Sequence, residues 1–81
     1  MSRPVDATAA SLITLIERYA AHTGLSVSTV CRHAAGSGDV VARLLRGSTI
    51  TIRRFDRAVR YLSEHWPAEL AWPGEVPRPP K

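Results

Sequence analysis

The stretch that most constrains this fold runs from residue 19 to residue 36. It predicts the end of one helix, a sharp turn at Gly24 and a short second helix. Gly24 can adopt a positive-φ turn without steric cost, and Ser26 can cap the helix that follows. Ala20 is small where two helices must cross closely, and Val30 is placed to point back into a core. A short polar helix held at a steep angle in this way has a shape that fits a DNA major groove.

Apolar residues at three- and four-residue spacing predict four helices, divided by glycine and proline. The expected spans are about 6–21, 26–35, 39–46 and 51–66. Ser37 or Asp39 can cap the third helix, and Thr51 can cap the fourth. Ile50 and Phe55 stand at the hydrophobic-staple positions on either side of Thr51. The apolar faces expected for the third and fourth helices are Val40, Val41, Leu44 and Leu45, and Ile52, Phe55, Val59, Leu62 and Trp66.

Composition limits what such a chain can do. Its 81 residues allow one small domain, and a formal net charge of +4 with a pI of about 10.2 favours an anionic partner. No apolar run approaches the roughly 18 residues of a membrane span, and the first residues lack the apolar stretch of a signal peptide. The single cysteine excludes an internal disulfide. We therefore expect a cytoplasmic protein with no membrane association.

No constellation typical of catalysis or metal binding stands out. Cys31 and His33 lack a second pair at zinc spacing, and Cys31 is expected to be a small core residue. His22 and His65 lie near the expected ends of helices, where an imidazole suits the helix dipole. No pattern marks a nucleophile with its base. We expect no enzymatic activity, no cofactor, no metal and no small-molecule ligand.

Two short motifs suggest a first family. Gly24-Leu25-Ser26, followed by Ser28-Thr29-Val30 and Arg32, resembles the helix-turn-helix of the lac-repressor family, with Cys31 in place of that family's second serine. The resemblance covers about 18 residues, from 19 to 36. It implies that the helix over 26–35 reads DNA bases, and that Ser28, Thr29, Arg32 and His33 are exposed.

The order and length of the four helices resemble a second family, the lambda-repressor and Cro-like (XRE-type) DNA-binding domain, over about residues 8–66. The spacing from Gly24-Leu25-Ser26 to Arg46-Gly47 is similar to that family's, whereas Val27 and Cys31 stand where it usually has glutamine and alanine. This resemblance implies that the helix over 39–46 enters the groove instead, exposing Gly38, Asp39, Ala42, Arg43 and Arg46. It also implies that Thr51, Arg53 and Arg54 contact phosphate.

The two resemblances place the base-reading residues on different helices, and both helices cannot fully enter one groove. The hydroxyls, arginine and imidazole of residues 26–35 are all suited to base edges, whereas Asp39 would repel nearby phosphates. The side chains therefore slightly favour residues 26–35, while the four-helix span favours 39–46. The candidates for base reading are Ser28, Thr29, Arg32, His33, Arg43 and Arg46.

Arginine dominates the segment between Val40 and Arg60, which holds six arginines against one acid, Asp56. Arg53 and Arg54 fall in the first turn of the last predicted helix, where the positive dipole disfavours a cation by about 0.3–1 kcal/mol. A DNA phosphate at that position would make the two positive charges favourable instead. The candidates for phosphate binding are Ser26, Ser37, Thr51, Arg53, Arg54 and Arg57.

The chain contains no asparagine and no glutamine, the two side chains that pair bidentately with adenine. Base reading would then rest on arginine, serine, threonine and histidine. We therefore expect G·C pairs at the best-specified positions of a binding site.

Together these patterns predict an all-α fold, a compact four-helix helix-turn-helix domain over 6–66. It lies between a disordered N-terminus (1–5) and a Pro-rich, mostly extended tail (67–81). The predicted function is sequence-specific binding of double-stranded DNA by a transcriptional regulator of bacterial or phage type, acting as a homodimer. Two alternatives stay open. One is a helical interaction module that uses Trp72 and the Pro-Arg-Pro-Pro of the tail, and the other is an antitoxin-like partner of another DNA-binding protein.

Overall fold

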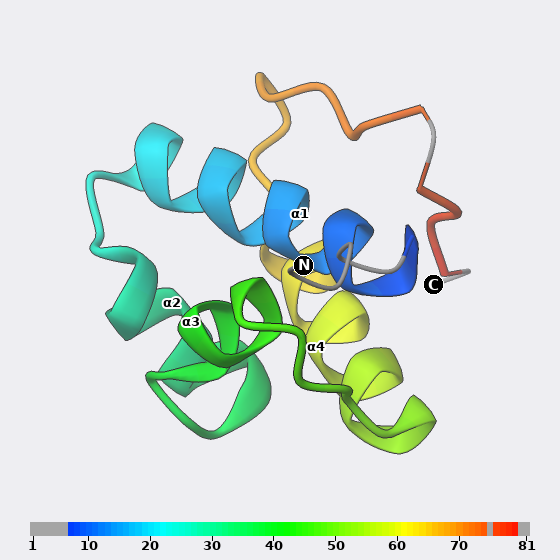
Figure 1. Ribbon diagram of the computed structural model, residues 1–81. Helices are drawn as coiled ribbons and strands as arrows, with labels where there is room; N and C mark the ends of the chain where they lie inside the picture. Colours follow the sequence, from blue (N-terminus) through cyan, green and yellow to red (C-terminus); the bar gives the residue numbers. More distant parts are fainter. Residues whose placement is uncertain (1–6, 75, 80–81) are drawn as a thin grey trace.

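The computed structural model describes residues 7–74 and 76–79, which form four α-helices and no strand. The helices are α1 (Ala7–Thr23), α2 (Val27–Ala35), α3 (Val40–Leu45) and α4 (Ile52–His65), as Figure 1 shows. The prediction of an all-α fold is confirmed for this part of the chain. The radius of gyration of the Cα atoms, 12.0 Å, is close to the value of about 12 Å expected for a compact domain of this length.

The end of α1 differs from the expected one. The helix continues to Thr23, two residues past the predicted end at residue 21. Gly24 is what ends it, because its amide donates to the Ala20 carbonyl at 3.0 Å while its φ of 77° turns the chain away. The predicted start at Asp6 lies outside the described residues.

The caps of α2 and α4 lie where the sequence predicts them. The Ser26 hydroxyl oxygen accepts the Thr29 amide at 3.1 Å, and the Thr51 hydroxyl oxygen accepts the Arg54 amide at 3.2 Å. The cap expected for α3 is different, because Asp39 occupies the N-cap position without a side-chain capping bond.

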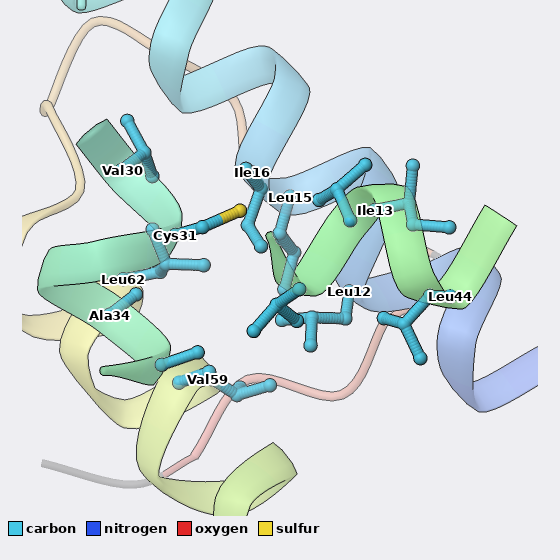
Figure 2. Close-up of a cluster of buried hydrophobic side chains, with 14 of the residues drawn as sticks. Leu12, Ile13, Leu15, Ile16, Val30, Cys31, Ala34, Leu44, Val59 and Leu62 are labelled. Atoms are coloured by element: carbon cyan, nitrogen blue, oxygen red, sulfur yellow. The ribbon is translucent and has the colours of Figure 1, made fainter. Parts of the chain in front are cut away.

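One core holds the four helices together, as Figure 2 shows. α1 packs against both α2 and α4, and α2 packs against α3 and α4. Ala20 and Val30 are buried, as their positions around the turn predict, and Cys31 lies among aliphatic side chains. The largest fully buried side chains are Leu12, Leu15, Ile16, Val30, Cys31 and Leu62. Burial of these side chains is the main stabilising contribution to the fold.

Three large apolar residues are exposed, and for two of them, Leu45 and Ile52, this is contrary to expectation. Leu45 and Ile52 are exposed by 57% and 80%, and Leu25 by 41%. α3 is only six residues long, so Val40, Val41 and Leu44 already cover its inward face. α4 first reaches the core fully at Ala58, and its first turn projects beyond the other helices. The placement of Leu45 and Ile52 on apolar faces was therefore wrong.

The C-terminal tail, here residues 67–79 without residue 75, packs back on the helices through two tight turns. Figure 1 shows it passing on the side of α1 that faces away from α3. The Trp66 indole donates to the Leu70 carbonyl, and the Trp72 indole donates to the Val76 carbonyl, both at 2.7 Å. Val76 is buried in the core cluster. The tail is thus part of the folded body.

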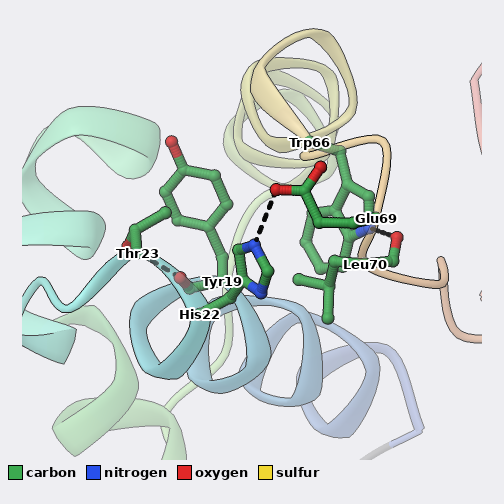
Figure 3. A network of polar contacts seen from close by, with 6 residues as sticks. All are labelled: Tyr19, His22, Thr23, Trp66, Glu69 and Leu70. Atoms are coloured by element: carbon green, nitrogen blue, oxygen red, sulfur yellow. Dashed lines mark hydrogen bonds and ion pairs between the residues drawn. The ribbon is translucent and has the colours of Figure 1, made fainter.

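Aromatic and polar contacts join the tail to α1, as Figure 3 shows. The Tyr19 and Trp66 rings lie 6.0 Å apart, and Trp66 meets Trp72 edge to face at 4.9 Å. His22 Nε2 donates to Glu69 Oε1 at 3.2 Å, which connects the last turn of α1 to the tail.

Candidate nucleic-acid interface

α3 separates an inner apolar face from an outer polar one. Val40, Val41 and Leu44 are buried against the other helices. Asp39, Ala42, Arg43 and Arg46 are exposed, because these positions recur on the other side of a helix with 3.6 residues per turn. The short helix therefore presents two guanidinium groups, one turn apart, on a backbone fixed by the core.

Asp39 holds one of these guanidinium groups. Its Oδ1 lies 3.7 Å from Arg43 Nη1, and the Ser37 hydroxyl donates to the same Oδ1. The Ser37 hydrogen bond, and after it the charge of Arg43, keeps the pKa of Asp39 below its ordinary value. Ser37 and Asp39 thus position Arg43 rather than cap α3.

The second guanidinium group is oriented by its own helix. Arg46 Nε donates to the Ala42 carbonyl at 3.3 Å, which satisfies one acceptor of the last turn of α3. No other side-chain hydrogen bond within the described residues engages Arg46. Its two terminal nitrogens are therefore available to a ligand.

A groove lies between α3 and the beginning of α4. Arg43 of α3 lines it, together with Thr51 and Arg54 at the beginning of α4. The Thr51 hydroxyl accepts the Arg54 amide as a cap and keeps its own proton for a further acceptor. Three of the sequence-predicted residues thus meet at one groove, with the positive end of the α4 dipole beside them.

Ser48 and Thr49 also line this groove, although neither is among the residues predicted from the sequence. The signal was present in the run Ser-Thr-Ile-Thr after Gly47, where three of four residues carry a hydroxyl. Only the tertiary packing shows that this loop, and not another hydroxyl-rich segment, borders the arginines.

The first turn of α2 lies close to the beginning of α3. A Cβ built on Gly38 would lie 2.8 Å from Ser28 Oγ and 3.3 Å from the Ser28 carbonyl oxygen, so the loop before α3 crosses Ser28 closely. The Ser26 hydroxyl donates to Thr29 Oγ1 at 2.8 Å, which occupies part of that side chain. Thr29 is therefore engaged by a neighbouring group, and Ser28, although exposed, lies against the loop before α3.

The remaining candidates lie apart from the groove. Arg32 and His33 are exposed in the last turn of α2. Arg57 Nη1 lies 3.7 Å from the place of a Cβ on Gly36, beside the C-terminal end of α2. There its charge stabilises the negative end of the α2 dipole. Arg53 is exposed in the first turn of α4.

A second groove lies between α4, the start of α1 and the tail, and its charge is mixed. It is lined by Asp56, Arg60 and Arg78 together with apolar Phe55 and Val76. The α3 side has Asp39 as its one carboxylate among several arginines, whereas this groove opposes acid and base more evenly. The α3 side is the better match for a polyanion.

Comparison with protein-family models, with curated proteins and with solved structures yields no significant match. Within the described residues, no group of three or more histidine, cysteine or carboxylate side chains is placed to hold a metal ion. In the same part of the chain, no helix combines the length and the apolar character needed to cross a membrane.

Proposed function

We propose that this protein is a helix-turn-helix domain that binds duplex DNA sequence-specifically and regulates transcription. The observation that carries the proposal is α3, whose inner face is buried while its outer face presents Arg43 and Arg46. The major groove of DNA is about 12 Å wide and admits one helix. An arginine-bearing helix backed by a rigid core is suited to that groove.

The contacts around α3 favour it over α2 as the base-reading helix. Gly38 lies close to Ser28, and Thr29 is hydrogen-bonded to Ser26, whereas Arg43 and Arg46 are exposed and each is restrained by one contact. The beginning of α2 lies next to α3 through the Ser28–Gly38 contact, and the beginning of α4 lies next to it across the groove. The first turns of both helices would then bind phosphates on either side of the major groove. This assignment reverses the slight preference for α2 that the side chains alone suggest.

The alternative, a helical interaction module, depends on Trp72 of the tail as an exposed anchor for a partner. Trp72, the candidate anchor for a partner, packs against Trp66 and donates to Val76 within the chain. Arg78 of the Pro-Arg-Pro-Pro segment lies 5.0 Å over the Trp72 ring. These groups are already used by the fold, so the tail offers no free aromatic anchor.

One domain of this size makes few base contacts, so we propose that it acts as a homodimer on a two-fold site in the cytoplasm. Half-sites for two copies of α3 would then be about 10 base pairs apart, which is one turn of the duplex. The number of chains per operator, measured by sedimentation with a defined duplex, tests this part of the proposal.

The test is binding to duplex DNA followed by fluorescence anisotropy. We expect a subset of a random duplex pool to be enriched over successive selections, with an affinity that falls steeply as salt rises. Arg43→Ala with Arg46→Ala should remove the preference for the enriched sequence. Arg18→Ala, on the exposed side of α1, is the matched control and should leave that preference intact. Binding that is equally weak for every sequence and vanishes near physiological salt would overturn the proposal. It would favour a helical interaction module or an antitoxin-like partner of another DNA-binding protein.

A further inference from the structure

The outer face of α3 carries a narrow chemical repertoire. Its long polar side chains are Arg43 and Arg46, and the methyl group of Ala42 lies on the same face. No asparagine or glutamine occurs anywhere in the chain, so the usual bidentate partner of adenine is missing from every element. Arginine in the same geometry pairs with O6 and N7 of guanine.

Arg43 is held in place before any ligand arrives. Asp39 Oδ1 lies 3.7 Å from its Nη1, and Ser37 donates to that oxygen in turn. A long side chain normally loses conformational freedom when it binds, and a side chain already restrained loses less. The Asp39 carboxylate therefore orients the Arg43 guanidinium group. Its negative charge also reduces the attraction of this face to DNA phosphates.

Arg46 is restrained by a different contact with a similar result. Its Nε donates to the Ala42 carbonyl at 3.3 Å, so the side chain follows the helix and its two terminal nitrogens remain free. Two parallel N–H donors are the geometry that matches the two acceptors of guanine in the major groove.

The spacing of the two residues sets the spacing of the bases. Positions 43 and 46 lie three residues apart, which is about 4.5 Å along a helix, and base pairs in DNA are stacked about 3.4 Å apart. We propose that α3 reads two guanines in adjacent or next-adjacent base pairs, one through Arg43 and one through Arg46. In this proposal the Ser37–Asp39 pair positions Arg43. The inference rests on the proposed function and adds the class of DNA sequence that the site selects.

The first test combines selection with base analogues. Selection from random duplexes should return a core with two guanines no more than two positions apart. Replacing either guanine by 7-deazaguanine, which lacks the N7 acceptor, should lower affinity roughly 5- to 150-fold. Replacing it by inosine, which keeps O6 and N7 and loses only the minor-groove amine, should change affinity less than about twofold. A core of A·T pairs alone, or equal losses with inosine and 7-deazaguanine, would overturn the inference.

The second test separates the two arginines from general charge. Arg43→Lys and Arg46→Lys keep the positive charge and lose the two parallel N–H donors of the guanidinium group. Each should therefore lower discrimination at one guanine only. Asp39→Asn should raise affinity for all sequences, because a negative charge near the phosphates is lost. The same change should reduce discrimination at the guanine that Arg43 reads. Arg18→Lys, on the exposed side of α1 and outside the proposed interface, is the control and should leave discrimination unchanged. Unaltered discrimination in both Arg43→Lys and Arg46→Lys would contradict the assignment.

The two proposals fail in different ways. If the wild-type protein enriches no sequence from the pool and binds all duplexes alike, the proposed function fails. If it binds one sequence tightly and that sequence lacks the paired guanines, the proposed function stands and only the guanine inference fails. Circular dichroism of each variant confirms that it is folded, and all the substituted side chains are exposed.

Discussion

At the level of single residues, Asp39 and Glu69 are two carboxylates whose surroundings alter their acidity. The pKa of Glu69 is lowered first by its own backbone amide and then by the hydrogen bond from His22. The pKa of Asp39 is lowered by the hydrogen bond from Ser37 and then by the charge of Arg43. Both groups are exposed, so each contributes little to stability on its own. The contact of Glu69 nevertheless connects α1 to the tail.

Glu69→Gln should lower the melting temperature slightly at neutral pH, by no more than about 2–4 °C. A carboxyl whose pKa is lower in the folded than in the unfolded state stabilises the fold above its unfolded pKa, about 4.3 for glutamate. That stability is lost as pH falls through the folded pKa. The difference from wild type should therefore disappear between about pH 5 and pH 3, as thermal melts at each pH will show.

Glu17→Gln, which removes another exposed carboxylate from α1, serves as the control for general charge. A difference between Glu69→Gln and wild type that stayed constant down to pH 3 would contradict the assignment to this carboxyl.

At the level of elements, the first turn of α4 is unusual. Arg53 and Arg54 lie there with no acidic residue in the same turn, so the charge of the turn opposes the helix dipole. Stability alone would favour aspartate or glutamate at these positions. Arg54 lines the groove beside α3, and the Thr51 hydroxyl is available there, so a phosphate would find both groups in one place.

Arg53→Ala combined with Arg54→Ala should weaken binding to all duplexes alike and reduce the slope of log K against log salt by about two. The free energy of unfolding should stay equal or rise by up to about 1 kcal/mol, because two unfavourable charges leave the positive end of the helix. Anisotropy titrations at several salt concentrations, together with urea denaturation, measure both effects.

Arg18→Ala combined with Arg60→Ala removes the same net charge from positions outside the groove. This pair should change the salt slope much less. A clear loss of stability in the Arg53/Arg54 variant would show that these residues serve the fold instead of a ligand.

At the level of the whole molecule, the tail completes the structure on the side away from α3 (Figure 1). Arg78 stacks over Trp72 and donates to the Ser63 hydroxyl and carbonyl at 3.0 Å. Trp72 in turn packs on Trp66, and Trp66 on Tyr19. The chain of contacts runs from the tail through α4 to α1, so the tail contributes to stability without approaching the groove.

Trp72→Ala should lower the free energy of unfolding by about 2 kcal/mol, because a half-buried indole and its edge-to-face contact are lost. In a domain of this size that corresponds to roughly 8–16 °C in melting temperature. DNA affinity, measured where the variant is fully folded, should match wild type.

Trp72→Phe keeps an aromatic ring and loses the hydrogen bond to Val76, so it should be less destabilised than Trp72→Ala. Unchanged stability in Trp72→Ala, or weakened DNA binding while it remains folded, would place Trp72 outside the structural role assigned here.

Much of the local structure was predictable, because local rules govern it. The caps at Ser26 and Thr51 and the turn at Gly24 follow from side-chain chemistry and glycine's freedom at positive φ. The failures at Leu45 and Ile52 have a common cause. Periodicity reports which face of a helix is apolar, but it does not report how far the neighbouring helices extend along that face.

The candidate site was predictable as a set of residues and not as an arrangement. Arg43, Thr51 and Arg54 were predicted from the sequence, but Thr51 and Arg54 were grouped with Arg57, which lies beside the end of α2. Ser37 and Asp39 were predicted as possible caps of α3, and Ser37 also as a phosphate ligand, whereas together they hold Arg43. Residues on different elements meet only after packing, and a one-dimensional pattern does not contain that distance.

The order of residues by itself determined the helical class, the turn chemistry and the absence of an adenine-pairing side chain, since each depends on a residue type or on spacing along one helix. Tertiary packing decided that the arginines of α3 face outward while the loop at Gly38 lies against Ser28, that two arginines share a groove, and that the tail returns to the core. These outcomes depend on how four helices bury one shared set of apolar side chains, a property of the whole chain that no single segment carries.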